Sequence, residues 1–338
     1  MKNNKFIKIT FLVLAFAMML TGCAKSNNGD NSGEEVSEEK ATETTVEITD
    51  VDGTVTVPVN PKRVISLDNR TYETLSDWGI ELAAVPKEVM PSDSPYVKDE
   101  NVQDIGNHRE PNLEIIAAID PELVIIGQRF GSFYEDIKAL VPNATIINLN
   151  FDVSGEDGAP GESLVEGLKN STVALGKIFD KNEEAEKLIA DFEKSIEDAK
   201  VSYNSEETVM SIVVSGGEIG FSAPGVGRVW GPMYEIFGWK SALEIDGSTT
   251  DHKGDDISVE AIAESNPDWI FVLDRDAATS SGEDSVPAQD VVDNSPALKN
   301  TTAISKGQII YAPKDTYTNE SIQTYIELFE NMASSLAK

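Results

Sequence analysis

One 18-residue pattern occurs twice in this chain and constrains its fold more than any other feature. Residues 112–129 read NLEIIAAIDPELVIIGQR, and residues 258–275 read SVEAIAESNPDWIFVLDR. Each copy predicts a capped helix, a turn at an Asp-Pro or Asn-Pro pair, and an apolar strand with an arginine at its end, Arg129 or Arg275. Because the unit recurs after 146 residues, it favours two similar α/β lobes over a tandem solenoid.

The positions of these two arginines predict a binding site. In open α/β sheets, ligands bind outside the carboxyl ends of the strands. Two lobes that face each other would therefore direct Arg129 and Arg275 into one shared cleft, where the ligand would be anionic. The chain has a formal net charge of −32, which makes arginines at strand ends more informative and disfavours nucleic acid and anionic membrane surfaces as partners.

The first 22 residues combine three lysines with a short apolar run and are typical of a secretory signal peptide. The apolar run at 11–20 is short for a membrane span. The only cysteine, Cys23, ends the sequence LTGC, where a bacterial lipoprotein is acylated. We therefore expect a lipid anchor at Cys23 on the outer face of a cell membrane and no intramolecular disulfide. Residues 23–45 are polar and acidic and predict a flexible tether.

The rest of the chain alternates between strand and helix signals, which predicts mainly parallel sheets. Residues 161–203 differ, because they have helical periodicity and almost no strand signal. A helix over 182–203 would be about 33 Å long at about 1.5 Å per residue, enough to cross between lobes or to cover one lobe. Other predicted elements are a hairpin at 46–57, strands near 63–67, 81–85, 144–149, 208–214 and 308–311, and helices near 133–140 and 320–336.

A glycine-rich stretch over 216–231 contains the sequence GVGRVWG at 225–231. Its spacing differs by one residue from the dinucleotide-binding fingerprint, and the chain has no Walker A motif. The sequence at 225–231 favours a loop that lets Arg228 and Trp230 approach a ligand, with a plain connecting loop as the alternative.

The sequence gives no positive evidence for catalysis. It lacks the nucleophile elbow, the zinc-protease motif and the kinase signatures. Its two histidines, His108 and His252, stand in separate halves, and a dedicated zinc or manganese site draws more ligands than these. From spacing alone, His252 is a solvated loop residue. We therefore expect a binding protein without a cofactor.

Two acidic residues occupy equivalent places in the repeat. Glu114 and Glu260 each follow a predicted helix cap, Asn112 or Ser258, by two residues. An acid in the first helical turn interacts favourably with the helix dipole, which is a sufficient structural reason for it. One exposed acid on each lobe could also dock onto a membrane partner with two-fold symmetry.

Several segments together resemble a known family, the siderophore-binding lipoproteins of bacterial ABC importers. The resemblance lies in the lipobox, in ITDVDGTVTVPVNPKRVISLD, in the two repeat copies and in the helical segment between them, and it covers residues 46–338. The similarity is to the branch of ferric catecholate binders. It implies the α/β fold of a class III solute-binding protein, with lobes at 46–181 and 204–338 and one long interlobe helix at 182–203.

The resemblance also implies roles for individual residues. Arg129 and Arg275 match the arginines that close two family strands, and Arg228 matches the arginine of the family's G-x-G-S-R loop, although the serine is missing here. Together they would form a cationic site for a ferric tris-catecholate, which carries excess negative charge. Trp230 would lie near this ligand and report its binding.

His252 and Tyr317 match a histidine and a tyrosine that complete the iron shell in part of the family when the siderophore supplies too few donors. Phenolate oxygen suits Fe(III), and imidazole is acceptable. The segment around Tyr317 departs from the family by lacking a tryptophan and glycines, which makes Tyr311 a rival. Glu114 and Glu260 match acids that engage the permease.

The expected protein is thus a monomeric, lipid-anchored carrier of a ferric siderophore for an ABC importer, with little hinge motion and, by family habit, a Gram-positive source. Haem, a corrinoid or a ferric hydroxamate is the alternative ligand on the same scaffold. Hydroxamate complexes are often neutral or cationic, so three arginines in one cleft count against them.

Overall fold

The computed structural model describes residues 44–155, 158–279 and 286–337, which belong to one compact unit. The predicted signal peptide at 1–22, the anchor at Cys23 and nearly all of the tether at 23–45 lie outside the described residues. Within the described ranges, no helix is both long enough and apolar enough to span a membrane.

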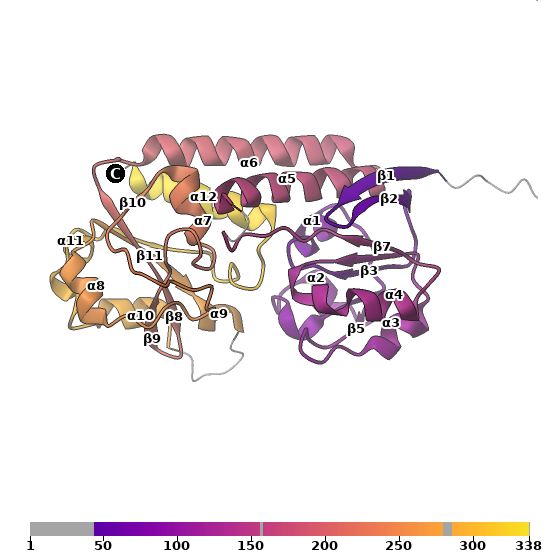
Figure 1. Ribbon diagram of the computed structural model, residues 1–338, viewed down its shortest axis with the longest axis horizontal. Coiled ribbons are helices and arrows are strands. Elements are labelled where there is room, and N and C mark those ends of the chain that lie inside the picture. The colour runs from indigo at the N-terminus through magenta and orange to yellow at the C-terminus, as the bar shows by residue number, and fades with distance from the viewer. Residues whose placement is uncertain (1–43, 156–157, 280–285, 338) are drawn as a thin grey trace, which may run out of the picture. The chain divides into compact units, whose positions relative to one another are not determined.

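The N-terminal lobe begins with a β-hairpin and continues into a five-stranded parallel sheet (Figure 1). The hairpin pairs β1 (Thr45–Asp50) with β2 (Gly53–Pro58), as its Asp-Gly signal predicts, and Asp50 accepts hydrogen bonds from the backbone of the turn. The sheet has the order β5 (Gln103–Asp104), β4 (Ala84–Val85), β3 (Val64–Leu67), β6 (Leu123–Ile126) and β7 (Thr145–Asn148).

Strands β3 and β6 are fully buried along their length. Apolar side chains from both faces of each strand therefore contribute to the core, as a parallel sheet covered by helices on both faces requires. The helices of this lobe are α1 (Tyr72–Asp77), η1 (Lys87–Val89), α2 (Pro95–Lys98), α3 (Leu113–Ile119), η2 (Gln128–Phe133) and α4 (Tyr134–Leu140).

The C-terminal lobe has a second sheet of five strands, of which four are parallel. The parallel order is β10 (Lys240–Ser241), β8 (Thr208–Ser215), β11 (Trp269–Asp274) and β12 (Ile309–Tyr311). Its helices are α7 (Gly231–Phe237), α8 (Val259–Ser265), α9 (Arg275–Thr279), α10 (Ala288–Asp293), η3 (Leu298–Asn300), α11 (Thr302–Lys306) and α12 (Ile322–Leu336). The predicted fold class, α/β with two mainly parallel sheets, is confirmed.

One strand of this lobe, β9 (Glu218–Phe221), lies inside the glycine-rich stretch at a place where we predicted no strand. It pairs antiparallel with β8 through a two-residue turn at Gly216 and Gly217, whose φ angles are 62° and 76°. A turn with positive φ at both central residues matches the twist of a β-hairpin, and glycine adopts it without strain. The two glycines were therefore a hairpin signal.

The two repeat copies form the predicted units, α3–β6 and α8–β11. The side chains of Asn112 and Ser258 cap the helices by accepting hydrogen bonds from Ile115 N and Ala261 N. Each helix ends at a residue in the left-handed conformation, Asp120 at φ 49° or Asn266 at φ 47°. The following proline cannot continue a helix, so the chain turns into the strand.

Two antiparallel helices, α5 (Pro160–Ile178) and α6 (Asn182–Ser202), lie along both lobes (Figure 1). Near its start, α5 buries Leu164 in the aromatic core of the C-terminal lobe. Near its end, it buries Leu175 in a core of the N-terminal lobe. The interlobe helix that we predicted at 182–203 corresponds to α6, whose buried residues Phe192 and Ala199 pack in the C-terminal core. The lobe boundaries remain a prediction, with α5 and α6 together as the connection.

Candidate ligand-binding site

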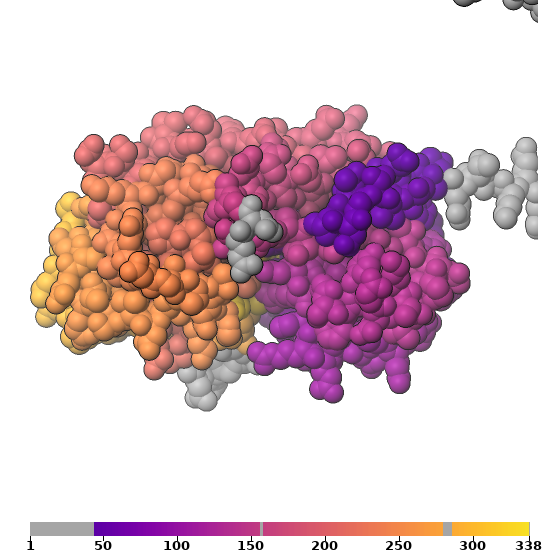
Figure 2. Space-filling model, viewed as in Figure 1, coloured from indigo at the N-terminus to yellow at the C-terminus, as the bar shows by residue number. Residues whose placement is uncertain are grey.

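A cavity of about 640 Å³ lies between the two lobes. Figure 2 shows the lobes in contact, the N-terminal lobe in indigo and magenta and the C-terminal lobe mainly in orange. The cavity is lined by residues from both, including Glu88, Met90, His108, Arg129, Arg228, His252, Arg275 and Tyr317. The fold therefore brings together all three predicted arginines, the predicted histidine and the predicted tyrosine. We call Arg129, Arg228 and Arg275 the arginine cluster.

Arg129 and Arg275 reach the cavity because each closely follows the carboxyl end of a central strand. Arg129 lies in η2, just after β6, and its Nη2 donates to Tyr317 O at 3.2 Å. Arg275 begins α9, directly after β11, and its Nη1 donates to Ser215 Oγ at 3.2 Å. The carboxyl edges of the two sheets thus supply the two arginines that the repeat predicts.

Arg228 comes from the glycine-rich loop before α7. The loop is tight because Gly227 N donates to Ala223 O at 2.8 Å and Gly231 N to Gly227 O at 2.7 Å. A Cβ on Gly227 would lie 2.4–2.6 Å from its neighbours, so a larger residue does not fit there. The glycines thus allow the loop to pack tightly, and the loop places Arg228 at the cavity.

Trp230 does not line the cavity. The residue before it, Val229, has φ 62°, a strained conformation for a β-branched residue. Beyond this turn the indole is fully buried, with its ring 5.5 Å from that of Phe271. The expectation that Trp230 contacts the ligand therefore needs correction, because its side chain is part of the C-terminal core behind the cavity.

Tyr317 lies against the arginine cluster. Its ring is 4.5 Å from the guanidinium carbon of Arg228 and 5.3 Å from that of Arg275, distances at which a cation attracts an aromatic face. Its carbonyl accepts hydrogen bonds from both Arg129 and Arg228. Tyr311, the rival, lies in β12 and is not among the residues that line the cavity.

The cavity contains both histidines of the chain. His252 lines it from an exposed loop of the C-terminal lobe, and His108 from the N-terminal lobe. Burial and the positive charges of Arg129 and Arg109 lower the pKa of His108 from its ordinary value. His108 therefore stays neutral at neutral pH. We did not predict its role, because no sequence spacing relates His108 to His252.

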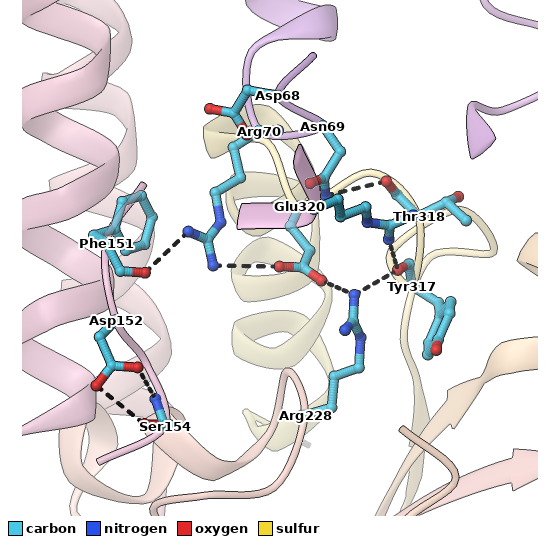
Figure 3. Close-up of polar contacts among 11 residues, drawn as sticks. Asp68, Asn69, Arg70, Phe151, Asp152, Ser154, Arg228, Tyr317, Thr318 and Glu320 are labelled. Atoms are coloured by element: carbon cyan, nitrogen blue, oxygen red, sulfur yellow. Dashed lines mark hydrogen bonds and ion pairs between the residues drawn. The ribbon is translucent and has the colours of Figure 1, made fainter. Parts of the chain in front are cut away.

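Behind the cavity lies a buried charge network that the sequence did not predict (Figure 3). Glu320 forms ion pairs with Arg228 and with Arg70, whose Nη2 is 3.5 Å from Glu320 Oε2. The Arg70 guanidinium also stacks on the ring of Phe151, 3.8 Å from its centroid, and donates to Phe151 O at 3.2 Å. The network joins the N-terminal lobe, the C-terminal lobe and the segment before α12.

That segment, residues 315–321, is bound mainly by the N-terminal lobe. Asn69 Nδ2 donates to Thr318 O at 3.2 Å, and the Glu73 carboxylate accepts hydrogen bonds from Asn319 Nδ2 and Ser321 Oγ. These contacts fix the segment that directly follows Tyr317. The tyrosine is therefore held in place although the family's glycines are missing here.

Glu114 and Glu260 are both exposed, each in the first turn of its helix, α3 or α8. Their equivalent, accessible positions on the two lobes are compatible with a docking role, which stays a prediction. Elsewhere, the described part of the chain holds no group of three or more His, Cys, Asp or Glu side chains that could bind a metal ion.

The chain is similar to several iron-binding proteins of known name. The petrobactin-binding protein YclQ of Bacillus subtilis is 28% identical over 339 residues, which cover 99% of this chain and 100% of YclQ. A crystal structure of YclQ matches with a TM-score of 0.71 at 26% identity and covers 88% of this chain and 100% of the YclQ chain.

Two further relatives show the range of ligands named for similar proteins. The catecholate-siderophore binding protein VctP of Vibrio cholerae matches with a TM-score of 0.68 at 25% identity and covers 87% of this chain and 99% of the VctP chain. The Fe(3+)-citrate-binding protein YfmC of Bacillus subtilis is 23% identical and covers 94% of this chain and 92% of YfmC. Residues 64–316 match the periplasmic binding protein family. Two α/β lobes around a shared arginine-lined cavity, together with this match, place the chain in the periplasmic binding protein family, as a binding protein and not an enzyme.

Proposed function

We propose that this protein captures an anionic ferric siderophore of the catecholate type outside the cytoplasm and delivers it to the permease of an ABC importer. The observation that carries the proposal is the convergence of the arginine cluster from three separate segments on one cavity. Among the described residues, no carboxylate forms an ion pair with Arg129 or Arg275. Partly buried guanidinium groups without a counter-ion favour an anionic ligand.

The chemistry of a ferric catecholate fits the lining of the cavity. Its metal-bound oxygens carry excess negative charge, and each arginine offers several donors in a fixed plane. Tyr317, Val89 and Met90 supply aromatic and apolar surface for the catechol rings. A neutral or cationic hydroxamate complex would leave the arginine cluster without compensation. The names of YclQ and VctP point to the same kind of ligand, whereas YfmC indicates that ferric citrate, also anionic, must be tested beside it.

The cavity also offers donors to the metal itself. We propose that His252 and Tyr317 complete the coordination of iron when the siderophore leaves positions open, as both line the cavity. Imidazole nitrogen and phenolate oxygen are acceptable ligands for Fe(III). The iron would arrive as part of the cargo.

The test is a binding titration with iron complexes of different charge and chemistry. Tryptophan fluorescence would be measured against ferric tris-catecholate, ferric bis-catecholate, ferric citrate, ferric hydroxamate, haem and a corrinoid. Ferric catecholates absorb where tryptophan emits, so a bound complex quenches by energy transfer even though Trp230 is buried. Tight binding of catecholates and little response to the others supports the proposal. Binding of hydroxamate, haem or corrinoid alone would keep the fold and refute the ligand class.

Delivery requires a location at the membrane and a contact with the permease. We propose that a lipid anchor at Cys23 holds the protein at the membrane of a Gram-positive envelope. We also propose that the protein is a monomeric carrier and that Glu114 and Glu260 contact the permease. Both acids are exposed, on corresponding helices of the two lobes. Exposed charges of this kind steer and orient association more than they add affinity.

A further inference from the structure

Among the described residues, one acidic side chain forms an ion pair with an arginine that lines the cavity. This residue is Glu320, and its partner is Arg228. Glu320 does not line the cavity itself, and its side chain is 7% exposed. One carboxylate oxygen contacts Arg228, and the other lies 3.5 Å from Nη2 of Arg70, whose side chain is 1% exposed. Figure 3 shows the carboxylate between the two guanidinium groups. A ligand in the cavity would therefore be separated from Glu320 by Arg228.

Glu320 keeps its negative charge at neutral pH. Burial opposes ionisation, but the guanidinium groups of Arg228 and Arg70 outweigh burial and lower the pKa of Glu320 from its ordinary value. The other buried charges in this region are Arg70 and Asp68, and Arg129 also acts on both acids. The electrostatic potential in the cavity thus depends on charges that no ligand touches.

We infer that Glu320 is a specificity-determining residue, whose buried charge sets how strongly the cavity discriminates between ligands that differ by one negative charge. The inference rests on the proposed function of the cavity. Charges are screened less where water is excluded, because the local dielectric constant is lower. The charge of Glu320 behind Arg228 therefore still acts on the ligand. Glu320 reduces the positive potential in the cavity and so weakens the preference for the more highly charged complex. The lower affinity allows that complex to be released.

The experiment compares two complexes of the same tris-catecholate siderophore. The Fe(III) and Ti(IV) complexes have similar size and shape, but the Ti(IV) complex carries one negative charge fewer. The readout is the ratio of their dissociation constants, because a purely structural defect weakens both complexes alike. Glu320→Gln should raise the preference for the Fe(III) complex by roughly tenfold, as expected for one unit of charge in a partly buried site.

Two further variants separate charge from geometry. Arg70→Gln removes a positive charge and should shift the ratio in the opposite direction by roughly the same factor. Arg70→Gln combined with Glu320→Gln removes one charge of each sign and should return the ratio to the wild-type value. Because Glu320→Gln leaves the buried Arg70 with one partner fewer, that variant can fail to fold. In that case, Arg70→Gln and the double variant test the inference.

The outcomes are distinct. The inference is supported if the ratio of the two dissociation constants changes with the summed charge of residues 70 and 320. A ratio that stays within about twofold in every folded variant, while the wild type binds both complexes, overturns the inference and leaves the proposed function standing. Failure of the wild-type protein to bind either complex overturns the proposed function and the inference together.

Discussion

Asp68 lies just after strand β3, near Arg70 and Arg129, and its side chain is fully buried. The residue opposite is Gly127, where a Cβ would lie 2.2 Å from Asp68 Oδ1. Glycine at that position therefore allows a carboxylate to approach the backbone that leads to Arg129. Burial raises the pKa of Asp68 to about 6, although Arg70 and Arg129 oppose the shift.

This shift predicts a stability difference that depends on pH. Because the folded-state pKa of Asp68 exceeds its ordinary value of 3.8, its contribution to folding is fully present below that value and is lost as the pH rises through about 6. The Asp68→Asn side chain cannot ionise, so the variant should not lose this stability as the pH rises. The unfolding free energy of the variant, relative to wild type, should therefore rise by roughly 2 kcal/mol between pH 4 and pH 7.

Urea denaturation at several pH values measures this difference. Asp246→Asn, at an exposed position, is the matched control and should show the same pH dependence as the wild type. If Asp68→Asn follows the wild-type curve across the whole range, Asp68 does not hold its proton more tightly in the folded protein.

The arginine cluster gives the second prediction at this scale. Arg275→Gln removes one guanidinium that faces the cavity and keeps a polar side chain of similar length. Hydrogen bonds to charged groups contribute about 1.5–3 kcal/mol, so the dissociation constant for a ferric tris-catecholate should increase roughly 10- to 100-fold. Fluorescence titration measures it, with circular dichroism to check the fold.

The matched control is Arg63→Gln, since Arg63 is an arginine that does not line the cavity. It contacts Asp120 at 3.6 Å and Glu122 at 3.1 Å, and its side chain is 47% exposed. Exposed pairs contribute little, so ligand affinity should not change with this variant. Equal affinities for Arg275→Gln and wild type would exclude Arg275 from the binding site.

At the scale of elements, helix α5 determines how the two lobes are joined. Leu164 and Leu168 are buried in the core that contains α7 and α12, whereas Leu175 and Ile178 are buried against the N-terminal hairpin and sheet. Helix α6 packs against α12, where the rings of Phe192 and Phe329 stack at 5.9 Å. A helix that is shared by two cores resists bending, so we expect lobe closure on binding to be small.

The middle of α5 carries a testable close contact. Gly167 faces Phe151, and a Cβ there would lie 2.2 Å from the ring. Alanine favours helix by about 1 kcal/mol over glycine. The steric clash should nevertheless win, so Gly167→Ala should destabilise the protein by about 1–3 kcal/mol in urea denaturation.

The control for this prediction is Gly131→Ala in η2. A Cβ at Gly131 would meet nothing within 4 Å, and the backbone there is not left-handed. We expect a change of about 0.5 kcal/mol or less. If Gly167→Ala is more stable than the wild type, Phe151 moves away from the added methyl group. The close packing of Phe151 against α5 would then be wrong.

At the scale of the whole molecule, function requires that a loaded carrier meets its permease. Glu114 and Glu260 lie on α3 and α8, the helices of the two repeat copies, and both are exposed. Replacing both by glutamine should reduce siderophore uptake by cells and leave ligand affinity unchanged, because neither lines the cavity. Transport of a radioactive iron complex and a parallel binding titration distinguish the two effects.

Glu264→Gln is the matched control, since it removes an exposed acid from the same helix α8. Its uptake should equal that of the wild type. If the double variant also transports at the wild-type rate, the two acids serve only the helix dipole, which is the structural reason for acids in a first turn.

Some residues of this chain take the conformation that their local sequence predicts, and others do not. Asn112, Ser258, Asp120 and Asn266 begin and end their helices as local rules predict, because capping depends on neighbours within a few residues. Gly216 and Gly217 were a local hairpin signal that our sequence analysis did not use. Trp230 could not be placed from sequence, since the strained turn at Val229 decides whether the indole faces ligand or core.

The sequence by itself determined the two-lobed α/β fold and the arginines at the ends of β6 and β11, since strand periodicity, helix caps and a repeat are properties of short segments. Only the tertiary structure decided that His108 and His252 share a cavity and that Arg70 and Glu320 form a buried ion pair. These residues belong to segments about 140 to 250 positions apart in the chain. Their proximity depends on how the lobes and the segment before α12 pack, because a contact between distant segments is fixed by the packing of the whole molecule and leaves no local pattern.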